Sequence, residues 1–255
     1  MVALDIDGTL VDHDDRLRAD VREAVQRVIR AGVPVVLATG RSWHGTEPVV
    51  QALGLPPGKF VASNGAVTVS FPPLVIDRMV TFDATEIVAR VAALHPEAAL
   101  AVEVVGSGYK VTKAFPDGEI SGEIVHVSLA ELTETPVTRV VVRDPNASED
   151  DFVRLAERVG MHGVGYFIGW TAWLDIAPDG VDKAHAVAMI CRNLGIEAAD
   201  VLAIGDGRND IELLRWAGRG VALGDAPGSV REAATAVTDA FEDGGTANEL
   251  NRWFA

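Results

Sequence analysis

Cysteine is almost absent from this sequence: Cys191 is the single example, so no disulfide can form within the chain. Positive charge is scarce as well, because 22 lysines and arginines stand against 37 acidic residues and give a formal net charge of −15. A surface this acidic repels nucleic-acid backbones and anionic membranes, so we expect neither as a partner. Any reaction on a phosphate group then needs a local pocket whose field opposes that of the whole protein.

Long apolar stretches are also missing. No run approaches the ~20 residues that span a bilayer, and the first residues do not resemble a basic-then-apolar signal segment. Together with the single cysteine, this favours a reducing, cytoplasmic location. What is present is ordinary for a globular protein: 255 residues, of which 48% are hydrophobic and 23% charged, enough for one or two domains.

The first 42 residues are predicted to form a strand, a helix and a second strand. The short apolar run Val2–Leu4 leads directly into Asp5-Ile6-Asp7-Gly8-Thr9. Apolar residues then recur at helical spacing until Gly32, which suits a left-handed helix stop. The apolar strand 33–38 follows and ends in Thr39-Gly40-Arg41-Ser42. Strand, helix, strand is the unit of a parallel sheet, so we expect both polar strand ends at one crevice.

The carboxy-terminal part repeats this pattern. Asp182 is expected to cap a helix that stops at Gly195, and the apolar run 201–204 then leads into Gly205-Asp206. Thr246 and Glu249 have the spacing of a capping box, which predicts the start of the last helix. The other elements predicted here are a helix over 211–214 and a strand over 220–223.

The middle of the chain has a different pattern. Apolar and polar residues alternate in several runs, which is typical of strands with one wetted face and predicts a mainly antiparallel sheet covered by helices. We therefore expect an α/β protein with a Rossmann-like parallel-sheet core, residues 1–79 and 179–255, and an inserted α/β domain, residues 80–178. The runs are 101–105, 109–112, 138–142 and 173–176, and the predicted helices lie near 84–95 and 148–159.

Two smaller features complete the expected fold. Ser63–Ile76 is predicted to form a small hairpin that belongs to the first domain. The inserted domain also contains a histidine and several aromatic residues that are expected mainly to fill its core: His162, Tyr166, Trp170 and Trp173.

Four carboxylates follow apolar strands at two places in the chain. Asp5 and Asp7 lie two residues apart, so their side chains project to the same side unless the turn diverts one. For an isolated pair, the simpler interpretation is that one carboxylate caps a turn. Asp206 and Asp210 follow another apolar strand, however, and four carboxylates at two strand ends favour a cation site. Hard divalent ions with oxygen ligands, such as Mg²⁺, fit it best.

Lys183 is placed at the first position of its predicted helix, where the helix dipole disfavours a cation by ~0.3–1 kcal/mol. A solvated lysine that tolerates this small penalty is one interpretation. An anion site is the other, because a helix amino terminus and an ammonium group both attract phosphate, and nearby carboxylates would keep the lysine charged. Thr39 and the amides of its glycine turn add neutral donors suited to phosphate oxygens.

These residues resemble, in order, the four motifs of the haloacid dehalogenase superfamily. The motifs are Asp5-Ile6-Asp7-Gly8-Thr9-Leu10, Thr39-Gly40-Arg41, Lys183 and Gly205-Asp206-Gly207-Arg208-Asn209-Asp210. Further segments look like the Cof-type sugar-phosphatase branch, which has the larger inserted α/β cap: Ser63-Asn64-Gly65-Ala66, Gly180-Val181-Asp182-Lys183 and Val221-Ala222-Leu223-Gly224-Asp225-Ala226.

The resemblance implies a Mg²⁺-dependent phosphatase that hydrolyses a small phosphate monoester, such as a sugar phosphate. Asp5 would accept the phosphoryl group as an aspartyl phosphate, and Asp7 would protonate the leaving oxygen and then activate water. The implied Mg²⁺ ligands are Asp5, the backbone carbonyl of Asp7, Asp206 and, directly or through water, Asp210. The implied catalytic residues are Asp5, Asp7, Thr39 and Lys183. The implied substrate-binding residues are Thr39, Gly40, Arg41, Asn64, Lys183 and Asn209.

Alternatives remain at this stage. Arg41 follows a turn, where a surface ion pair is as common as a substrate contact. The same motifs also occur in phosphomutases, which return the phosphoryl group to another hydroxyl, and a non-catalytic sensor of phosphorylated metabolites would keep the same fold. The presence of Asp7 favours phosphate monoesters, because branches with other leaving groups lack this second aspartate. In each case the expected partner is a small phosphorylated metabolite, and the inserted cap is expected to select it.

Overall fold

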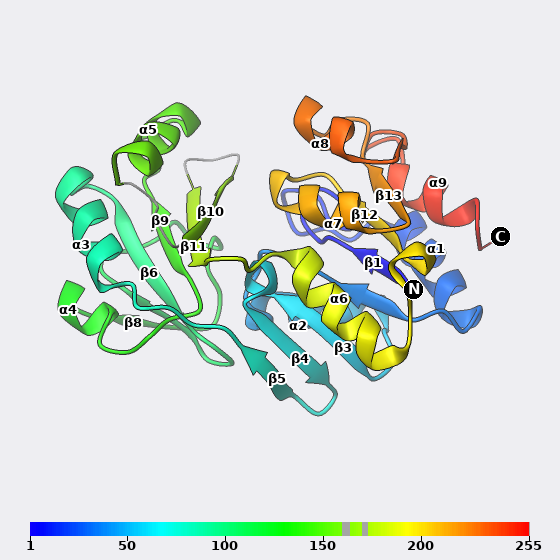
Figure 1. Ribbon diagram of the computed structural model, residues 1–255, viewed down its shortest axis with the longest axis horizontal. Coiled ribbons are helices and arrows are strands. Elements are labelled where there is room, and N and C mark those ends of the chain that lie inside the picture. Colours follow the sequence, from blue (N-terminus) through cyan, green and yellow to red (C-terminus); the bar gives the residue numbers. More distant parts are fainter. Residues whose placement is uncertain (160–163, 170–172, 255) are drawn as a thin grey trace. The chain divides into compact units, whose positions relative to one another are not determined.

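The structure is a computed structural model that describes residues 1–159, 164–169 and 173–254. The chain folds into two compact units (Figure 1). The first unit comprises Met1–Arg41, Thr46–Arg78 and Asp182–Ala255, and the second comprises Ser42–Gly45 and Met79–Val181. The expected fold class is confirmed, because the first unit contains a parallel sheet and the second a mainly antiparallel one.

A parallel sheet with the strand order β14-β13-β12-β1-β2 forms the centre of the first unit. In the central strand β1, Leu4 lies opposite Leu37 of β2 and Ile204 of β12. Every residue of β1 is buried, as expected for a short apolar strand covered on both faces. The strands are β1 (Val2–Leu4), β2 (Val35–Leu37), β12 (Leu202–Gly205), β13 (Arg219–Ala222) and β14 (Ala236–Val237).

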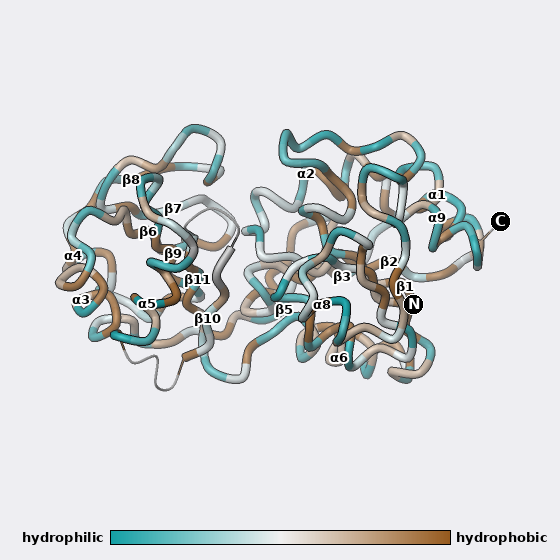
Figure 2. The backbone as a smooth tube through the Cα atoms, turned by 90° about the horizontal axis from the view of Figure 1, so that it is seen from above, coloured by the Kyte–Doolittle hydropathy of each residue, from teal (hydrophilic) through white to brown (hydrophobic). Residues whose placement is uncertain are grey.

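Helices lie on both sides of this sheet. Figure 2 shows α1 and α9 on one side of the strands and α6 and α8 on the other. Ala3 of β1 belongs to the apolar cluster that joins the sheet to α6, α7 and α8, through residues such as Val187 and Leu213. The α-helices that include first-unit residues are α1 (Ala19–Arg30), α2 (Trp43–Leu53), α6 (Lys183–Leu194), α7 (Ile211–Trp216), α8 (Gly228–Ala233) and α9 (Gly245–Asn251); the short 3₁₀ helices are η1 (Ser63–Gly65), η2 (Ala198–Asp200) and η3 (Arg208–Asp210).

Local signals place the ends of α6 where the sequence predicts them. The side chain of Asp182 accepts a hydrogen bond of 2.7 Å from the backbone N–H of His185, which caps the helix. Gly195 ends it in the left-handed conformation, with φ at 66°. Lys183 is therefore the first residue of α6, as predicted.

The predicted capping box of α9 is wrong. The helix begins at Gly245, and its N-cap residue is Gly244 in the left-handed conformation. The hydroxyl of Thr246 donates instead to the backbone carbonyl of Thr9, at 2.7 Å, and Glu249 accepts from Arg219, at 2.6 Å. Both side chains have partners from distant segments, and these tertiary contacts replace the local ones that the spacing suggested.

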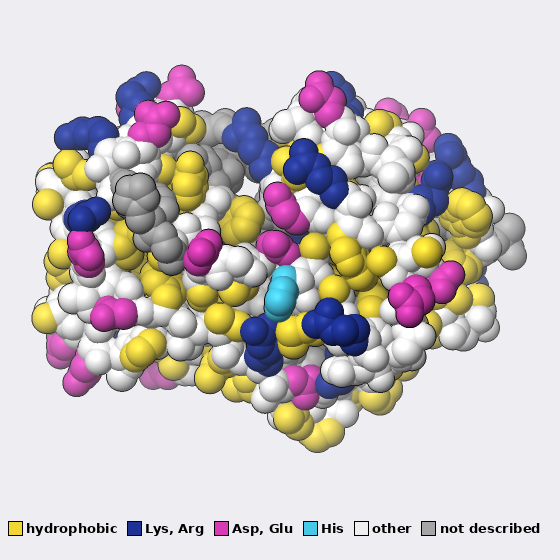
Figure 3. Space-filling model, in the orientation of Figure 1, with side chains coloured by type: hydrophobic (Ala, Val, Ile, Leu, Met, Phe, Trp, Pro, Cys, Tyr) yellow, Lys and Arg dark blue, Asp and Glu magenta, His cyan; other side chains and the backbone are white. Residues whose placement is uncertain are grey.

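A three-stranded sheet, β3-β4-β5, continues from the edge of the parallel sheet through a bridge between Ala38 and Val61. Its last two strands occupy the segment predicted as a hairpin. β5 is an edge strand, and the apolar residues Leu74, Val75 and Ile76 near the β4–β5 turn are 40 to 50% exposed. Figure 3 shows hydrophobic side chains on the surface at the bottom of the view. The strands are β3 (Gly58–Ala62), β4 (Val67–Phe71) and β5 (Val75–Met79).

The second unit is built on a six-stranded sheet in the order β10-β11-β9-β6-β7-β8. Its neighbouring strands run antiparallel except for β7 with β8, which are parallel. Alternate residues such as Leu100 and Val102 pack under helices α3 and α5. The elements are β6 (Ala99–Val104), β7 (Gly108–Val111), β8 (Glu123–His126), β9 (Val140–Arg143), β10 (Val164–Gly169), β11 (Trp173–Pro178), α3 (Thr85–Leu94), α4 (Leu129–Leu132) and α5 (Glu149–Val159).

The opposite face of this sheet mixes apolar and charged side chains. Ala101 and Tyr109 belong to a small apolar cluster there, and Trp173 packs against it, as expected. The buried guanidinium of Arg139 lies 3.4 Å from a carboxylate oxygen of Glu103 and 3.5 Å from one of Asp175.

For Tyr166 this expectation is wrong. Tyr166 is 43% exposed, so it does not fill the core, and the reason is its place on β10, the outermost strand of the sheet. His162 and Trp170 lie outside the described residues.

None of the helices in the described part of the chain has the length and apolar character of a membrane span.

Candidate active site

The carboxyl ends of β1, β2 and β12 meet at one edge of the parallel sheet (Figure 1). Because the three strands are parallel and in register, the residues that follow them must lie close together. Asp5 follows β1, Thr39 comes two residues after β2, and Asp206 follows β12. The strand ends predicted to share a crevice are therefore neighbours in the first unit.

Three carboxylates form a tight buried cluster at this edge. One carboxylate oxygen each of Asp5, Asp206 and Asp210 can be chosen so that all three lie within 4.8 Å of one another. The three residues are 4%, 8% and 0% exposed. Such a concentration of negative charge away from water requires positive charge nearby.

Lys183 supplies one positive charge. Its Nζ donates to Asp5 Oδ1 at 2.8 Å and to Asp210 Oδ1 at 2.6 Å, and the side chain is completely buried. Burial alone would lower the pKa of Lys183, but the carboxylates of Asp210 and Asp5 hold it above its ordinary value. The lysine is therefore charged and enclosed, which excludes the interpretation that it is solvated.

One lysine does not balance three carboxylates. Burial, followed by the charge of Asp210, raises the pKa of Asp5 to about 7 against the opposing effect of Lys183. Burial and the charge of Asp5 likewise raise the pKa of Asp206 well above its usual value. With all groups ionised, three negative charges and one positive charge leave two negative charges, and the donors are all hard oxygens. A divalent cation such as Mg²⁺ fits both the charge and the donor set.

Asp7 lies outside this cluster. Its side chain is 60% exposed, and both carboxylate oxygens accept from Nε of Arg41, at 3.2 and 3.1 Å. Asp5 is buried and Asp7 exposed after the chain turns at Gly8, which has a left-handed φ of 69°, so the turn separates the surroundings of the two carboxylates, as the sequence left open. Arg41 also pairs with Asp15, so it forms the ion pairs that one interpretation of the sequence proposed.

Several of the expected phosphate- and substrate-binding residues lie together. The hydroxyl of Thr39 is buried and accepts from the backbone N–H of Arg41 at 3.1 Å. The amide of Asn209 donates to Oδ1 of Asn64 at 2.9 Å. A Cβ added to Gly40 would lie 3.2 to 3.5 Å from these two side-chain amides, so the glycine permits their close approach.

Two contacts around Asp206 could not be seen in the sequence. The hydroxyl of Thr9 donates to Asp206 Oδ1 at 3.0 Å, and both residues are buried. A Cβ added to Gly8 would lie 2.4 Å from Asp206 Oδ2, so only a glycine leaves room for this carboxylate. The Gly-Thr pair after the second aspartate was a possible signal, but the sequence does not say which distant carboxylate it contacts.

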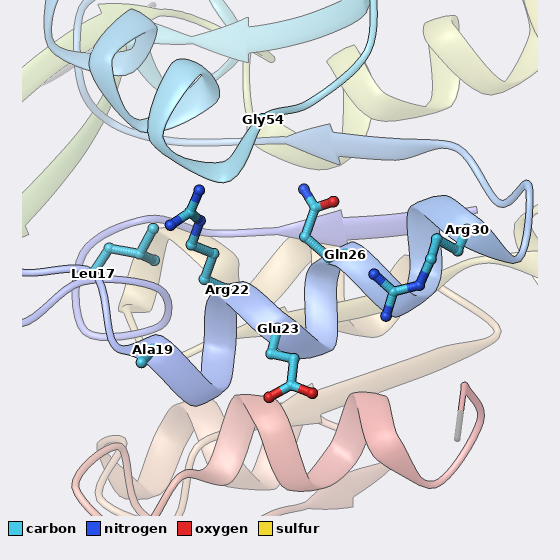
Figure 4. A pocket seen from close by; sticks show the side chains of 7 residues that line it. All are labelled: Leu17, Ala19, Arg22, Glu23, Gln26, Arg30 and Gly54. Carbon is cyan, nitrogen blue, oxygen red and sulfur yellow. The ribbon is translucent and has the colours of Figure 1, made fainter.

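A cavity of about 640 Å³ lies elsewhere on the first unit, beside α1 (Figure 4). The arginines Arg22 and Arg30 line it. The side chain of Glu23 points to the side of α1 that lies away from Gly54. None of the expected site residues lines it. The full set of lining residues is Leu17, Ala19, Arg22, Glu23, Gln26, Arg30 and Gly54.

A model of the haloacid dehalogenase-like hydrolase family matches residues 2–250. The chain belongs to this family. A Natronomonas pharaonis protein named phosphoglycolate phosphatase is 33% identical, over 95% of this chain and 93% of its own length. A Serratia proteamaculans protein named HMP-PP phosphatase is 27% identical, over 89% of this chain and 84% of its own length. Among solved structures, a sugar phosphatase of subclass IIB superposes with a TM-score of 0.84 at 23% identity, over 99% of this chain and 98% of its own.

The resemblance seen in the sequence is thereby confirmed, and the chain is an enzyme of the phosphatase type that this family contains. The related phosphatases carry the names of different substrates, among them phosphoglycolate and a phosphorylated ribitylaminouracil. Since a shared fold does not determine the substrate, these names do not transfer to this chain.

Proposed function

We propose that this protein is a Mg²⁺-dependent phosphatase that hydrolyses a small phosphate monoester, such as a sugar phosphate, through an aspartyl phosphate on Asp5. One observation carries the proposal: the buried carboxylate of Asp5 lies among Asp206, Asp210 and the charged Lys183. A nucleophile that attacks a phosphoryl group needs positive charge around it, because the incoming group is itself an anion.

The charged residues of the site would bind the metal ion and the phosphoryl group. Asp5, Asp206, Asp210 and the backbone carbonyl of Asp7 would hold Mg²⁺. When bound, the ion neutralises part of the cluster's charge and of the phosphoryl charge. Lys183, held by two carboxylates at the amino end of α6, has a fixed ammonium group that would attract the phosphoryl oxygens.

In the first step, a carboxylate oxygen of Asp5 forms a bond to phosphorus while the bond from phosphorus to the ester oxygen breaks. The carboxyl group of Asp7 gives its proton to that leaving oxygen. In the second step, the carboxylate of Asp7 takes a proton from a water molecule. The water oxygen forms a bond to phosphorus while the bond from phosphorus to Asp5 breaks, which releases inorganic phosphate and restores the Asp5 carboxylate. The exposure of the Asp7 carboxylate supports this role, because both the leaving alcohol and the water must reach it.

The remaining polar residues of the site bind the substrate in this proposal. Thr39 and Asn209 contribute uncharged donors to the phosphoryl group, and Gly40, Arg41 and Asn64 contact the rest of the ester. Residues 80–178 act as a cap domain that selects the leaving group, while 1–79 and 179–255 form the catalytic core.

The proposal is tested by measuring inorganic phosphate released from a panel of phosphate esters. We expect sustained release with Mg²⁺, none with excess chelator, and recovery when Mg²⁺ is restored. Ca²⁺ should inhibit, because its longer and looser coordination can engage both oxygens of Asp5 and disturb in-line attack. Isomerised ester without phosphate release would indicate a phosphomutase, and binding without turnover a sensor. Full activity in excess chelator would refute the metal site.

The Asp7→Asn variant tests the acid–base role. An alkyl phosphate has a poor leaving group and needs the proton, so we expect the rate of its first step to fall by ~10²–10⁴-fold. An aryl phosphate with an acidic phenol as leaving group should lose much less in the first step. The measurement is the single-turnover rate of alcohol or phenol release for both esters, which reports the first step, with Asp14→Asn as a control, since Asp14 lies in the following loop and pairs with Arg16. Equal losses on the two esters would count against the role in leaving-group protonation.

A further inference from the structure

Asp206 is held differently from the other two carboxylates of the cluster. Asp5 and Asp210 are bound by the ammonium group of Lys183, whereas Asp206 accepts from the hydroxyl of Thr9 at 3.0 Å. A Cβ added to Gly8 would lie 2.4 Å from the other oxygen of Asp206, Oδ2. The two residues after Asp7 therefore set the position of the Asp206 carboxylate.

Thr9 is in turn held by the last helix. The hydroxyl of Thr246, the second residue of α9, donates to the backbone carbonyl of Thr9 at 2.7 Å. Thr9 and Thr246 are 0% and 1% exposed, so water cannot readily replace this bond if it is removed. A buried hydrogen-bonded path thus runs from Thr246 through Thr9 to Asp206, between segments 237 residues apart.

The start of α9 is itself held by hydrogen bonds to Gly245. The N–H of Gly245 donates to the carbonyl of Ala240 at 3.0 Å, and the carbonyl of Gly245 accepts from the hydroxyl of Thr238 at 2.9 Å. A Cβ on Gly245 would lie 2.0 Å from the carbonyl oxygen of Asp239, so the chain passes very close here. The residue before Thr246 is therefore held by two hydrogen bonds and by close packing.

We propose that Thr246 is a positioning residue for the cation site: through Thr9 it holds the Asp206 carboxylate in the place from which it binds Mg²⁺. The inference rests on the proposed function, because it takes Asp5, Asp206 and Asp210 to be the metal ligands. Direct hydrogen-bond partners of metal ligands typically change metal affinity by ~10–100-fold when removed. Thr246 acts one residue further out, so we expect a loss of about 3- to 10-fold.

The test measures the Mg²⁺ dissociation constant by calorimetric titration, together with the thermal unfolding temperature of the metal-free protein. Thr246→Val removes the hydroxyl at nearly constant volume, and Thr246→Ser keeps a hydroxyl. Thr238→Val is the matched control, since it removes another buried threonine-to-carbonyl bond at the start of α9 without touching Thr9. We expect weaker Mg²⁺ binding in Thr246→Val, affinity close to that of the unmodified protein in Thr246→Ser, and a clearly smaller loss in Thr238→Val, which leaves the bond from Thr246 to Thr9 in place.

Each other outcome has a defined meaning. If the unmodified protein binds no Mg²⁺, the proposed function fails. If it binds Mg²⁺ and Thr246→Val binds equally well, the function stands and the positioning role is overturned. Equal losses in Thr246→Val and Thr238→Val also overturn it, because affinity would then follow general loosening of α9. Should Thr246→Val not fold, Thr9→Val interrupts the same path at Asp206, and unchanged affinity in that variant removes the inference.

Discussion

Replacing Asp5 by asparagine is expected to abolish turnover while leaving the fold intact. The amide has almost the same shape as the carboxylate but does not attack phosphorus, so no aspartyl phosphate forms. Losses on removing a catalytic nucleophile reach the order of 10⁶-fold elsewhere, and we expect at least ~10⁴-fold here. The measurement is single-turnover phosphate release, with Asp77→Asn as the control, because Asp77 lies in the same unit and pairs with Lys59 outside the acid cluster.

The same variant has a second expected effect, on stability in metal-free buffer. Because the pKa of Asp5 in the folded protein is raised to about 7, its ionisation weakens folding as the pH rises from about 4 to 7. Asparagine has no charge to lose or gain, so Asp5→Asn should be more stable than the unmodified protein at pH 8 and differ less at pH 5. Thermal unfolding at both pH values measures this. Near-normal turnover, or a stability difference that does not grow with pH, would contradict the assignment of Asp5.

The parts of the fold that local chemistry controls were predictable from the sequence. Asp182 and Gly195 bound α6 because a capping carboxylate and a left-handed glycine act within one helical turn. The meeting of Asp5 with Asp206 was predictable for a related reason. Both follow short apolar strands, and parallel strands bring their carboxyl ends to a single edge.

Side chains whose partners lie far away in the chain could not be placed in the same way. Thr246 and Glu249 have the spacing of a capping box, yet they bind Thr9 and Arg219. The capping-box rule considers only partners within the first turn of the helix. In the structure, the carbonyl of Thr9 and the guanidinium of Arg219 bind these side chains instead. The exposure of Asp7 and its ion pair could not be predicted, because they depend on the turn at Gly8 and on Arg41, neither of which the strand pattern describes.

The site also shows which sequence observations had a physical basis. A lysine at the first position of a helix opposes the dipole, and the structure gives the compensation: two carboxylates bind its ammonium group. The unfavourable position of Lys183 at the start of a helix therefore indicated the acidic cluster that binds it. Arg41 was ambiguous in the sequence for a good reason, since an arginine at this edge finds two carboxylates, those of Asp7 and Asp15, that pair with it.

Lys183→Met is expected to reduce both stability and activity strongly. The substitution keeps most of the buried volume but leaves the carboxylates of Asp5 and Asp210 without their shared cation. Removing one partner of a buried ion pair costs about 3–5 kcal/mol, and we expect a loss of that size in metal-free buffer at pH 8. Turnover should fall as well, because the fixed ammonium group no longer attracts the phosphoryl oxygens.

The pH dependence identifies the cause of this loss. The pKa of Lys183 in the folded protein lies above its ordinary value, so the lysine stays charged between pH 5 and 8 and its own titration does not change stability there. The carboxylates do change: without the lysine their ionisation is more costly, so the variant should recover part of its stability as they are protonated towards pH 5. Mg²⁺ at pH 8 should restore part of it too, because the ion replaces the missing positive charge.

A matched substitution separates this effect from the loss of any lysine. Lys59 pairs with Asp77 on the three-stranded sheet but is 33% exposed, and ion pairs at such positions contribute only about 0–1 kcal/mol. Lys59→Met should therefore be nearly neutral and independent of Mg²⁺. Adding Asp210→Asn to Lys183→Met should regain stability, because it removes one of the two uncompensated charges. A Lys183→Met variant that matches Lys59→Met in stability, pH dependence and Mg²⁺ response would show that the cluster is not the charged, buried centre that the mechanism requires.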